Sequence, residues 1–581
     1  MFLKVDEKPD GRIYMSFARS IHVPGKYPRT KVVKSLGYDV DYLDQYDDPI
    51  AHFRAEAKRL TELEKETGIA QLDLDLSDKL NVDETYRKNL GFLIFSYIYH
   101  ELGLDKFMRN RQRYENFEFD ANAILKLLVY GRLLFPGSKR KTWKKREMFF
   151  ENFNFTLESV YRCLSYLAKL TPKFPEYLNR KIRENYGRNT ETVYYDVTNY
   201  YFEIDEEDEY RRKGMGKDKY GVPIIQMGLF LDADGLPILY NLFPGNTHDS
   251  VTLRGMARTI RTEYELGRII VVGDSAIGSA DNIWYLLSCG YGYIFSRSIA
   301  KSSQAFKEYV LDPSGYSVSK SKKIVQQDGS VCEVPTFMMK SQRIPREIQV
   351  TSTSGGKVKK VVDEKLVVYW SAKYAKRAKK KRAKAIKKAE HYIKVPSEYE
   401  ANRSGGASKY IRNLKVDKDG CIREDVYDHL SLDLEAIEAD AKLDGYYAMV
   451  SSEMEKSDAE IVASYRELWK IEDAFRVSKS DLETRPVYLS RQDRIEAHFL
   501  TCYLAFLLLR LVQRRLKVHL STEKILDALR ACNGTNIAGN YFCFETLSED
   551  LLNIGNSFGV DFEARYRTLG EIRKMVAASK K

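Results

Sequence analysis

The change from strand to helix patterns between residues 191 and 297 constrains the fold more than any other feature of the chain. ETVYYDVTNYYFEI, which starts at 191, is rich in aromatic and β-branched residues and predicts a strand. IIQMGLFLDADGLPILYNLF predicts a hairpin that turns at DADG. Helical patterns near 249–265 and 280–289 then separate the strands RIIVVGD and YGYIFSR. Strands that alternate with helices in this way predict a mixed α/β sheet.

The segments on either side of this pattern have other periods. Apolar residues recur at helical spacing before residue 188 and again after about 457, where a long helix is expected to reach 482. Polar strands, Ser/Gly-rich stretches and a lysine-rich helix after residue 300 predict a β-rich insertion, and DGYYAMVSS resumes the sheet. We therefore expect six parts: a β-ribbon with a linker helix (1–75), a helical DNA-binding domain (76–188), the first part of the sheet core (189–299), a β-rich insertion domain (300–443), the second part of the core (444–500) and a helical C-terminal region (501–581).

The positive charge of the chain is concentrated in two segments. The net charge is +12, yet residues 371–388 hold ten Lys and Arg, residues 138–146 hold six, and neither run contains an acid. The rest of the chain is therefore slightly acidic. Local basicity of this kind favours a defined polyanion-binding surface. The alternative is that each run is only a solvated helix face or loop.

Composition excludes several classes of protein. The seven cysteines are scattered and never form CxxC, which argues against a disulfide framework and a zinc ribbon. The N-terminal residues MFLKVDEKPD lack the apolar segment of a signal peptide, and the longest apolar stretch, near 499–509, is about half a membrane span. We expect a soluble, cytoplasmic protein with no membrane partner.

The strand and helix patterns point to three acidic residues as a candidate site. Asp196 lies within the strand VYYDVTNYYF, and Asp274 ends the apolar strand IIVVGD. Acids at the carboxyl ends of sheet strands are where an open α/β sheet places its active site. Glu472 lies on the expected helix, with Tyr465 and Lys479 seven residues away on either side and thus on the same helix face.

Converging carboxylates favour hard cations such as magnesium. Two such ions can clamp the attacking and leaving oxygens of a phosphodiester. Cations on the same helix would then hold the flanking phosphates. Each acid also has an ordinary interpretation, since an Asp at a strand end often caps a turn and a Glu beside Lys and Arg often forms a surface ion pair.

The order strand, strand, helix resembles that of a bacterial insertion-sequence transposase with an RNase H-like DDE core, in the long branch of the insertion-sequence-four superfamily. The resemblance rests on YYDVTNYYFE, VVGDSAIGSADNI and YRELWKIEDAFRVSK followed by TRPVYLSRQDRIEAHFL, with further similarity in FPGNTHDS and RLLFPGSKRKTW. It covers about 130 to 500. It implies that Asp196, Asp274 and Glu472 are catalytic and bind two Mg²⁺ ions, for which Mn²⁺ can substitute.

The resemblance also implies residues that contact DNA. The family's tyrosine and lysine fall on Tyr465 and Lys479, whereas its arginine falls on Leu468, so Arg466 and Arg476 are the candidates to replace it. Tyr369 and Trp370 are aromatic candidates within an insertion domain over the active site, although Trp370 could equally be core. The expected DNA-binding residues are Tyr465, Arg466, Trp469, Arg476 and Lys479 on the helix, Lys139, Arg140, Lys141, Lys144, Lys145 and Arg146 in the first basic run, and Lys376, Arg377, Lys380, Lys381 and Arg382 in the second.

The function implied by this resemblance is cut-and-paste DNA transposition. The expected partners are double-stranded DNA with terminal inverted repeats, target DNA and a second copy of the chain in a synaptic dimer, in the bacterial cytoplasm at the nucleoid. Two alternatives remain open. One is a decayed or domesticated transposase that acts as a DNA-binding regulator, and the other is a nuclease of the same fold without strand transfer.

Overall fold

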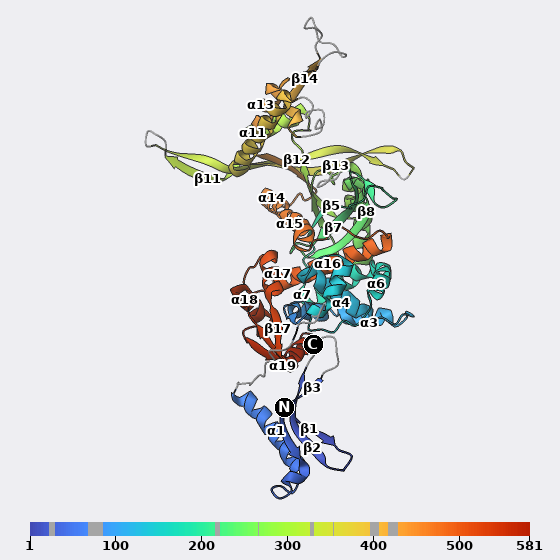
Figure 1. The fold of residues 1–581 in the computed structure, drawn as a ribbon. Coiled ribbons are helices and arrows are strands. Elements are labelled where there is room, and N and C mark those ends of the chain that lie inside the picture. The colour runs from blue at the N-terminus through green and yellow to red at the C-terminus, as the bar shows by residue number, and fades with distance from the viewer. Residues whose placement is uncertain are drawn as a thin grey trace. The chain divides into compact units, whose positions relative to one another are not determined.

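The computed structural model describes residues 1–21, 29–67, 79, 85–214, 221–264, 266–325, 330–352, 354–395, 406–415 and 428–581. The chain divides into two compact units (Figure 1). Unit 1 comprises 1–187, 200–204 and 474–581, and unit 2 comprises 188–199 and 205–473. Apart from residues 200–204, unit 2 is therefore one long insertion into the sequence of unit 1.

The N-terminal part of unit 1 is an antiparallel sheet with one helix. Met15 and Phe17, which alternate with Ser16 along the middle strand, pack on Phe53 of the helix. The strands and the helix occur where the sequence predicts them. Their bounds are β1 (Phe2–Glu7), β2 (Ile13–Ile21), β3 (Arg29–Tyr38), the short η1 (Asp39–Tyr42) and α1 (Pro49–Thr67).

The body of unit 1 is a helical bundle around α16 (Gln492–Arg515), which contacts α2, α4 and α6. This helix is long and apolar enough to cross a membrane, but 89% of its most apolar window is buried inside the structure. It is therefore the central helix of the bundle core. The surrounding helices are α2 (Phe92–Glu101), α3 (Leu104–Gln112), α4 (Ala121–Leu134), α5 (Lys139–Lys144), η2 (Lys145–Met148), α6 (Leu157–Leu170), α7 (Lys173–Tyr186), α17 (Thr522–Ala531), α18 (Glu549–Phe558) and α19 (Leu569–Ala578).

The C-terminal region is not wholly helical, which corrects the sequence prediction. It contains a sheet in the order β19–β18–β17–β4, in which Asn533 of β17 pairs with Asn89 of β4. The hairpin turns at Gly539, whose φ is +53°. Asn89 and Asn533 lie far apart in the sequence, so no local pattern predicts the pairing of β4 with β17. The strands are β4 (Arg87–Asn89), β17 (Asn533–Ala538), β18 (Tyr541–Phe544) and β19 (Tyr566–Thr568).

Unit 2 is built on a mixed sheet whose described strands run β11–β12–β13–β16–β10–β9–β5–β7–β6, with β8 paired to β7. β5, β9 and β10 are parallel, as is usual for strands joined through helices. The strands are β5 (Thr192–Tyr201), β6 (Arg212–Lys213), β7 (Pro223–Leu231), β8 (Pro237–Pro244), β9 (Ile270–Gly273), β10 (Gly292–Arg297), β11 (Ser317–Val325), β12 (Val331–Thr351), β13 (Lys357–Ser371) and β16 (Tyr446–Ser451).

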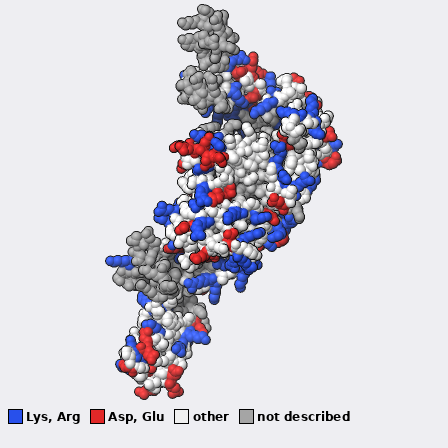
Figure 2. Space-filling model, turned by 90° about the vertical axis from the view of Figure 1, so that its right-hand side faces the viewer, with Lys and Arg blue, Asp and Glu red and all other residues white. Residues whose placement is uncertain are grey.

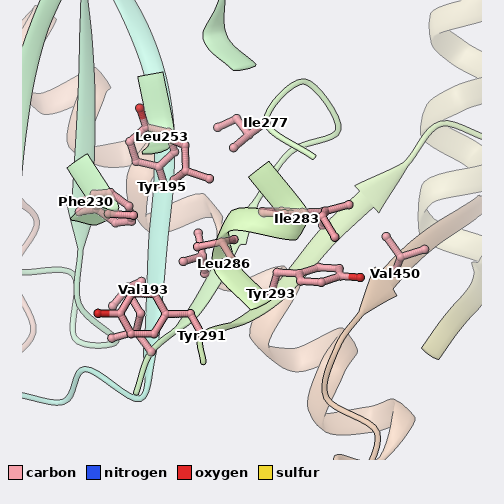
Figure 3. Close-up of a cluster of buried hydrophobic side chains, with 14 of the residues drawn as sticks. Val193, Tyr195, Phe230, Leu253, Ile277, Ile283, Leu286, Tyr291, Tyr293 and Val450 are labelled. Carbon is pink, nitrogen blue, oxygen red and sulfur yellow. The ribbon is translucent and has the colours of Figure 1, made fainter. Parts of the chain in front are cut away.

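Two helices, α8 (Asp249–Glu263) and α9 (Ala280–Ser288), supply side chains to the core of unit 2. Figure 3 shows Tyr195 and Tyr293 of the sheet among side chains from these helices. Leu253 of α8 and Leu286 of α9 are fully buried there. This core holds β5, β9 and β10 in place, and their carboxyl ends lie at one edge of the sheet.

The insertion differs from the separate β-rich module expected for 300–443. Its strand β13 pairs with β16, so β12 and β13 extend the central sheet. Leu366 and Val368 of β13 are buried in the core of unit 2, which explains the continuity. The remaining elements are α10 (Gln304–Leu311), α11 (Ala372–Lys394), η3 (Ser408–Tyr410), β14 (Ile411–Lys415), β15 (Asp428–Leu432) and α13 (Leu434–Lys442).

The expected helix over 457–482 is interrupted. α14 (Asp458–Arg466) stops at Glu467 and Leu468, α15 (Trp469–Arg476) follows, and the π-helical turn η4 (Val477–Asp481) ends the segment. Ser457 and Glu460 form a capping box at the start of α14. The uninterrupted helical face assumed for Tyr465, Glu472 and Lys479 is therefore wrong, because a break at 467–468 and a change to π-helical geometry at Val477 lie between the first and the last of them.

Candidate functional site

Asp196, in the middle of β5, lies level with Asp274, which directly follows the end of the neighbouring parallel strand β9. Tyr194 of β5 pairs with Val272 of β9, and the same register continued by two residues aligns the two acids. The strands are still adjacent there, since a Cβ on Gly273 would lie 3.3 Å from the carbonyl oxygen of Tyr195. The first two predicted acids therefore come from adjacent parallel strands.

The third parallel strand adds Ser296, a residue that the sequence analysis missed. Phe295 of β10 pairs with Gly273, so Ser296 follows in line with Asp274. The Ser296 side chain lies close enough to the Tyr465 phenol to lower its pKa. Its position near the end of YGYIFSR, the next strand after Asp274, is the signal that points to it.

Tyr465 connects the strand ends with the glutamate helix. Burial raises the pKa of Tyr465, the nearby Ser296 side chain lowers it, and the negative charges of Asp274 and Glu472 raise it further. The phenol therefore lies within electrostatic reach of both acids. Glu472 is exposed in the first turn of α15.

The two aspartates also accept hydrogen bonds from nearby backbone amides, as expected for acids that cap turns. Oδ1 of Asp274 accepts hydrogen bonds from the backbone amides of Ala276 at 2.9 Å and Ile277 at 3.3 Å. Oδ1 of Asp196 accepts one from the amide of Val197 at 2.7 Å. These bonds restrain both carboxylates at the sheet edge, where each remains half-buried.

The donor chemistry fits a hard divalent cation, because all three predicted ligands are carboxylates. Among the residues that the structure describes, no three His, Cys, Asp or Glu side chains lie close enough together to hold a metal ion. Asp196 and Asp274 are adjacent by strand register, and Glu472 is connected to Asp274 only through their shared effect on Tyr465. The three acids thus share one region without forming a closed ligand set.

The cations predicted on the glutamate segment have different surroundings. The Arg466 guanidinium lies 4.5 Å from the ring centre of Phe337 and 5.4 Å from that of Tyr369. Arg476 pairs with Asp481 at 3.3 Å. Lys479 lies on η4, with its Nζ 5.6 Å from the ring centre of Tyr200. Trp469 is 55% exposed.

The insertion aromatics are less accessible than expected. Tyr369 is buried at 2% exposure. The indole nitrogen of Trp370 donates to the Asp444 carbonyl at 3.0 Å, which matches its alternative interpretation as a packing residue. Tyr447 stacks on Tyr369 with a ring separation of 5.4 Å and is 45% exposed, so it forms the outer surface of this cluster.

The first basic run does not form one cationic surface. Ser138 caps α5, and Lys139 is only 5% exposed, in contrast to its expected role at the surface. Burial lowers the pKa of Lys139 to about 7. Arg146 stacks on Trp143 at 4.2 Å, and Lys145 lies over Phe135 at 4.9 Å. The exposed cations of the run are Arg140, Lys141 and Lys144.

The second basic run forms most of α11. Arg382 is paired with Asp444, and Tyr392 anchors the other end of the helix in a small core. Lys376, Arg377, Lys380 and Lys381 are exposed. On the face shown in Figure 2, blue cationic and red acidic side chains are interspersed, so the positive charge is not gathered there into one continuous patch.

Comparisons with known proteins identify the family. The family model of the transposase DDE domain matches residues 196–508, which is more than half of the chain. The matched range starts at Asp196 and includes Asp274 and Glu472. A search of curated proteins found no match.

Two solved structures show a distant likeness. One is a piggyBac transposase synaptic complex with hairpin DNA, at 9% identity and a TM-score of 0.34, with 85% of this chain and 84% of that chain covered. The other is a Mos1 transposase paired-end complex with the left transposon end, at 10% identity and a TM-score of 0.14, with 44% and 69% covered. Neither superposition is close enough to establish a common fold. The family model does not depend on them, and by its match the chain belongs to the transposase DDE domain family.

Proposed function

We propose that the protein is a DNA transposase that cuts the ends of its element and joins the freed 3′-hydroxyl ends to target DNA. The alignment of Asp196 with Asp274 on neighbouring parallel strands, inside the matched transposase domain, carries this proposal. The effect of Asp274 and Glu472 on Tyr465 supports the inclusion of the third acid. Acids at the carboxyl ends of parallel strands also support an RNase H-like core.

Asp196, Asp274 and Glu472 would hold two Mg²⁺ or Mn²⁺ ions, which in such a site activate water and stabilise the charge on the attacking and leaving oxygens. Around these acids, the Tyr465 phenol and the Ser296 hydroxyl lie near one another and can donate hydrogen bonds to phosphate oxygens. Lys479, α5 and α11 supply cations for phosphates of the bound DNA. The chain itself then acts by binding and positioning the DNA strands, with no covalent intermediate.

The proposal is tested with a linear DNA fragment that carries the sequence flanking this gene, including its terminal inverted repeats. We expect nicks at both repeat borders with magnesium and none with chelator. Asp196→Asn, Asp274→Asn and Glu472→Gln should each abolish cleavage and leave binding to the ends largely intact. Glu455→Gln is the matched control, because that carboxylate is 93% exposed in the same unit and should be dispensable.

Other outcomes separate the alternatives. Binding without any nick, in the wild-type chain, would support the DNA-binding regulator. Cleavage without joining of the 3′ ends to a second DNA would support a nuclease. Full cleavage by any one of the three acid variants would overturn the assignment of that acid. A dimer at paired ends and a location at the bacterial nucleoid also belong to this proposal, and cross-linking of protomers on end DNA tests the dimer.

A further inference from the structure

Four consecutive backbone carbonyls at the end of the glutamate segment are each held by a side chain from another helix. Arg530 of α17 donates to the Asp481 oxygen at 3.0 Å. Arg132 of α4 donates to the oxygens of Leu482 at 3.2 Å and Glu483 at 2.9 Å. Nε2 of His498 on α16 donates to the Thr484 oxygen at 2.9 Å. We call Arg132, His498 and Arg530 the carbonyl clamp.

The carbonyl clamp holds the chain at the point where the helical segment ends. Only the Asp481 oxygen belongs to η4, whose last carbonyls lack intrahelical partners, and the oxygens of Leu482, Glu483 and Thr484 follow the helix. Arg132 is 4% exposed, so its guanidinium is buried against these oxygens. Burial and the nearby Lys139 and Arg132 charges keep the pKa of His498 well below its usual range, so its imidazole is neutral.

Next to the carbonyl clamp, the turn η4 has π-helical hydrogen bonding. The amide of Leu482 donates to the Val477 oxygen at 3.0 Å, which is the i to i+5 spacing of a π-helix. The Ser478 hydroxyl bridges Tyr200 at 2.9 Å and Thr484 at 3.1 Å. Lys479 therefore leaves the position that a regular α-helix would give it and lies next to the Tyr200 ring.

Arg132 also reaches the first basic run. Its Nη2 donates to the Gly137 oxygen at 2.9 Å, immediately before Ser138 caps α5. One guanidinium thus joins the turn that bears Lys479 to the loop that begins the helix bearing Lys141. Both segments belong to unit 1.

We propose that Arg132 is a positioning residue that fixes two phosphate-contacting segments, η4 and the start of α5, relative to one another. It acts through backbone carbonyls and does not itself touch DNA. This inference rests on the proposed function, because it assumes that Lys479 contacts a phosphate of the transposon end.

The test is a salt titration of binding to the end fragment, with thermal unfolding measured for every variant. Lys479→Gln should lower the slope of log affinity against log salt by about 0.9, the value of one lost phosphate contact. Arg132→Met should lower this slope by at least as much. The slope of the double variant should be no lower than that of Arg132→Met alone. Arg567→Met is the matched control, since Arg567 is also largely buried and donates to a backbone carbonyl, that of Asp561.

Additive losses, or an unchanged slope in a folded Arg132→Met protein, would overturn the inference. If Arg132→Met does not fold, Ser478→Ala replaces it, because it removes the Tyr200 and Thr484 bonds and leaves the buried guanidinium. An unchanged slope in Ser478→Ala would then count against the inference. A wild-type chain that neither binds nor nicks the end fragment would refute the proposed function instead.

Discussion

Replacing Lys139 by methionine should stabilise the protein at neutral pH. The ammonium group is buried and has no hydrogen bond or ion pair within the described part of the chain, and Arg132 adds a like charge. Burial lowers the pKa of Lys139 from 10.5 to about 7. A lysine whose folded pKa is depressed destabilises the folded state most at low pH, where both states are charged, and the penalty fades as pH rises toward 10.5.

At about 1.4 kcal/mol per pKa unit, this penalty is about 4 kcal/mol at pH 7 and about 2 kcal/mol at pH 9. Methionine keeps the apolar stem and removes the charge, so the free energy of unfolding of unit 1 should rise by roughly these amounts. Urea unfolding at pH 6.5, 8 and 9.5 measures the difference, with Arg140→Met, an exposed neighbour, as the control. The reasoning is refuted if Lys139→Met is less stable than the wild type at every pH. A loss of salt slope in DNA binding would refute it as well, since that would place the lysine on a phosphate.

Three further predictions concern unit 2. Replacing Lys376, Arg377, Lys380 and Lys381 of α11 together with glutamine should lower the salt slope by up to about 3.6, with unchanged circular dichroism. An unchanged slope would make this part of the helix a solvated face. Glu364→Gln should destabilise unit 2 by about 3 kcal/mol, because Glu364 is fully buried and accepts a hydrogen bond from Arg346 at 3.0 Å. Chemical denaturation measures this change, and a loss below about 0.5 kcal/mol would contradict the prediction. Gly445→Ala should lower the free energy of unfolding by at least about 1 kcal/mol, since Gly445 has a φ of +90° and a Cβ there would lie 2.8 Å from the indole nitrogen of Trp370. The same change should expose Trp370 to fluorescence quenchers, and unaltered quenching would argue against the prediction.

The strand ends could be predicted because their signals are local. Asp196 lies within an aromatic strand and Asp274 follows an apolar one, and parallel pairing of the two strands makes these positions neighbours. Ser296 obeys the same rule, but a serine at a strand end has no charge to draw attention to it. The sheet and its flanking helices could therefore be predicted from patterns within short windows.

Other features depend on residues far away in the chain. Lys139 belongs to a run of cations, and only the packing of its helix against α4 and α6 decides that it is buried. The π-helical end of the glutamate segment is likewise followed by carbonyls that bind a distant partner, Arg132, which lies more than three hundred residues earlier. No local periodicity contains that information.

The central position of α16 has a consequence for biosynthesis. Its partners α2, α4 and α6 are complete by Leu170, whereas α16 begins at Gln492. At about 5–20 residues per second, synthesis of the intervening chain takes on the order of half a minute, and during this time the apolar faces of the early helices lack the helix that covers them. Unit 2 is made entirely within that interval. A nascent chain arrested before Gln492 would thus present a finished sheet together with an open, aggregation-prone bundle, and a chaperone would be needed for the bundle.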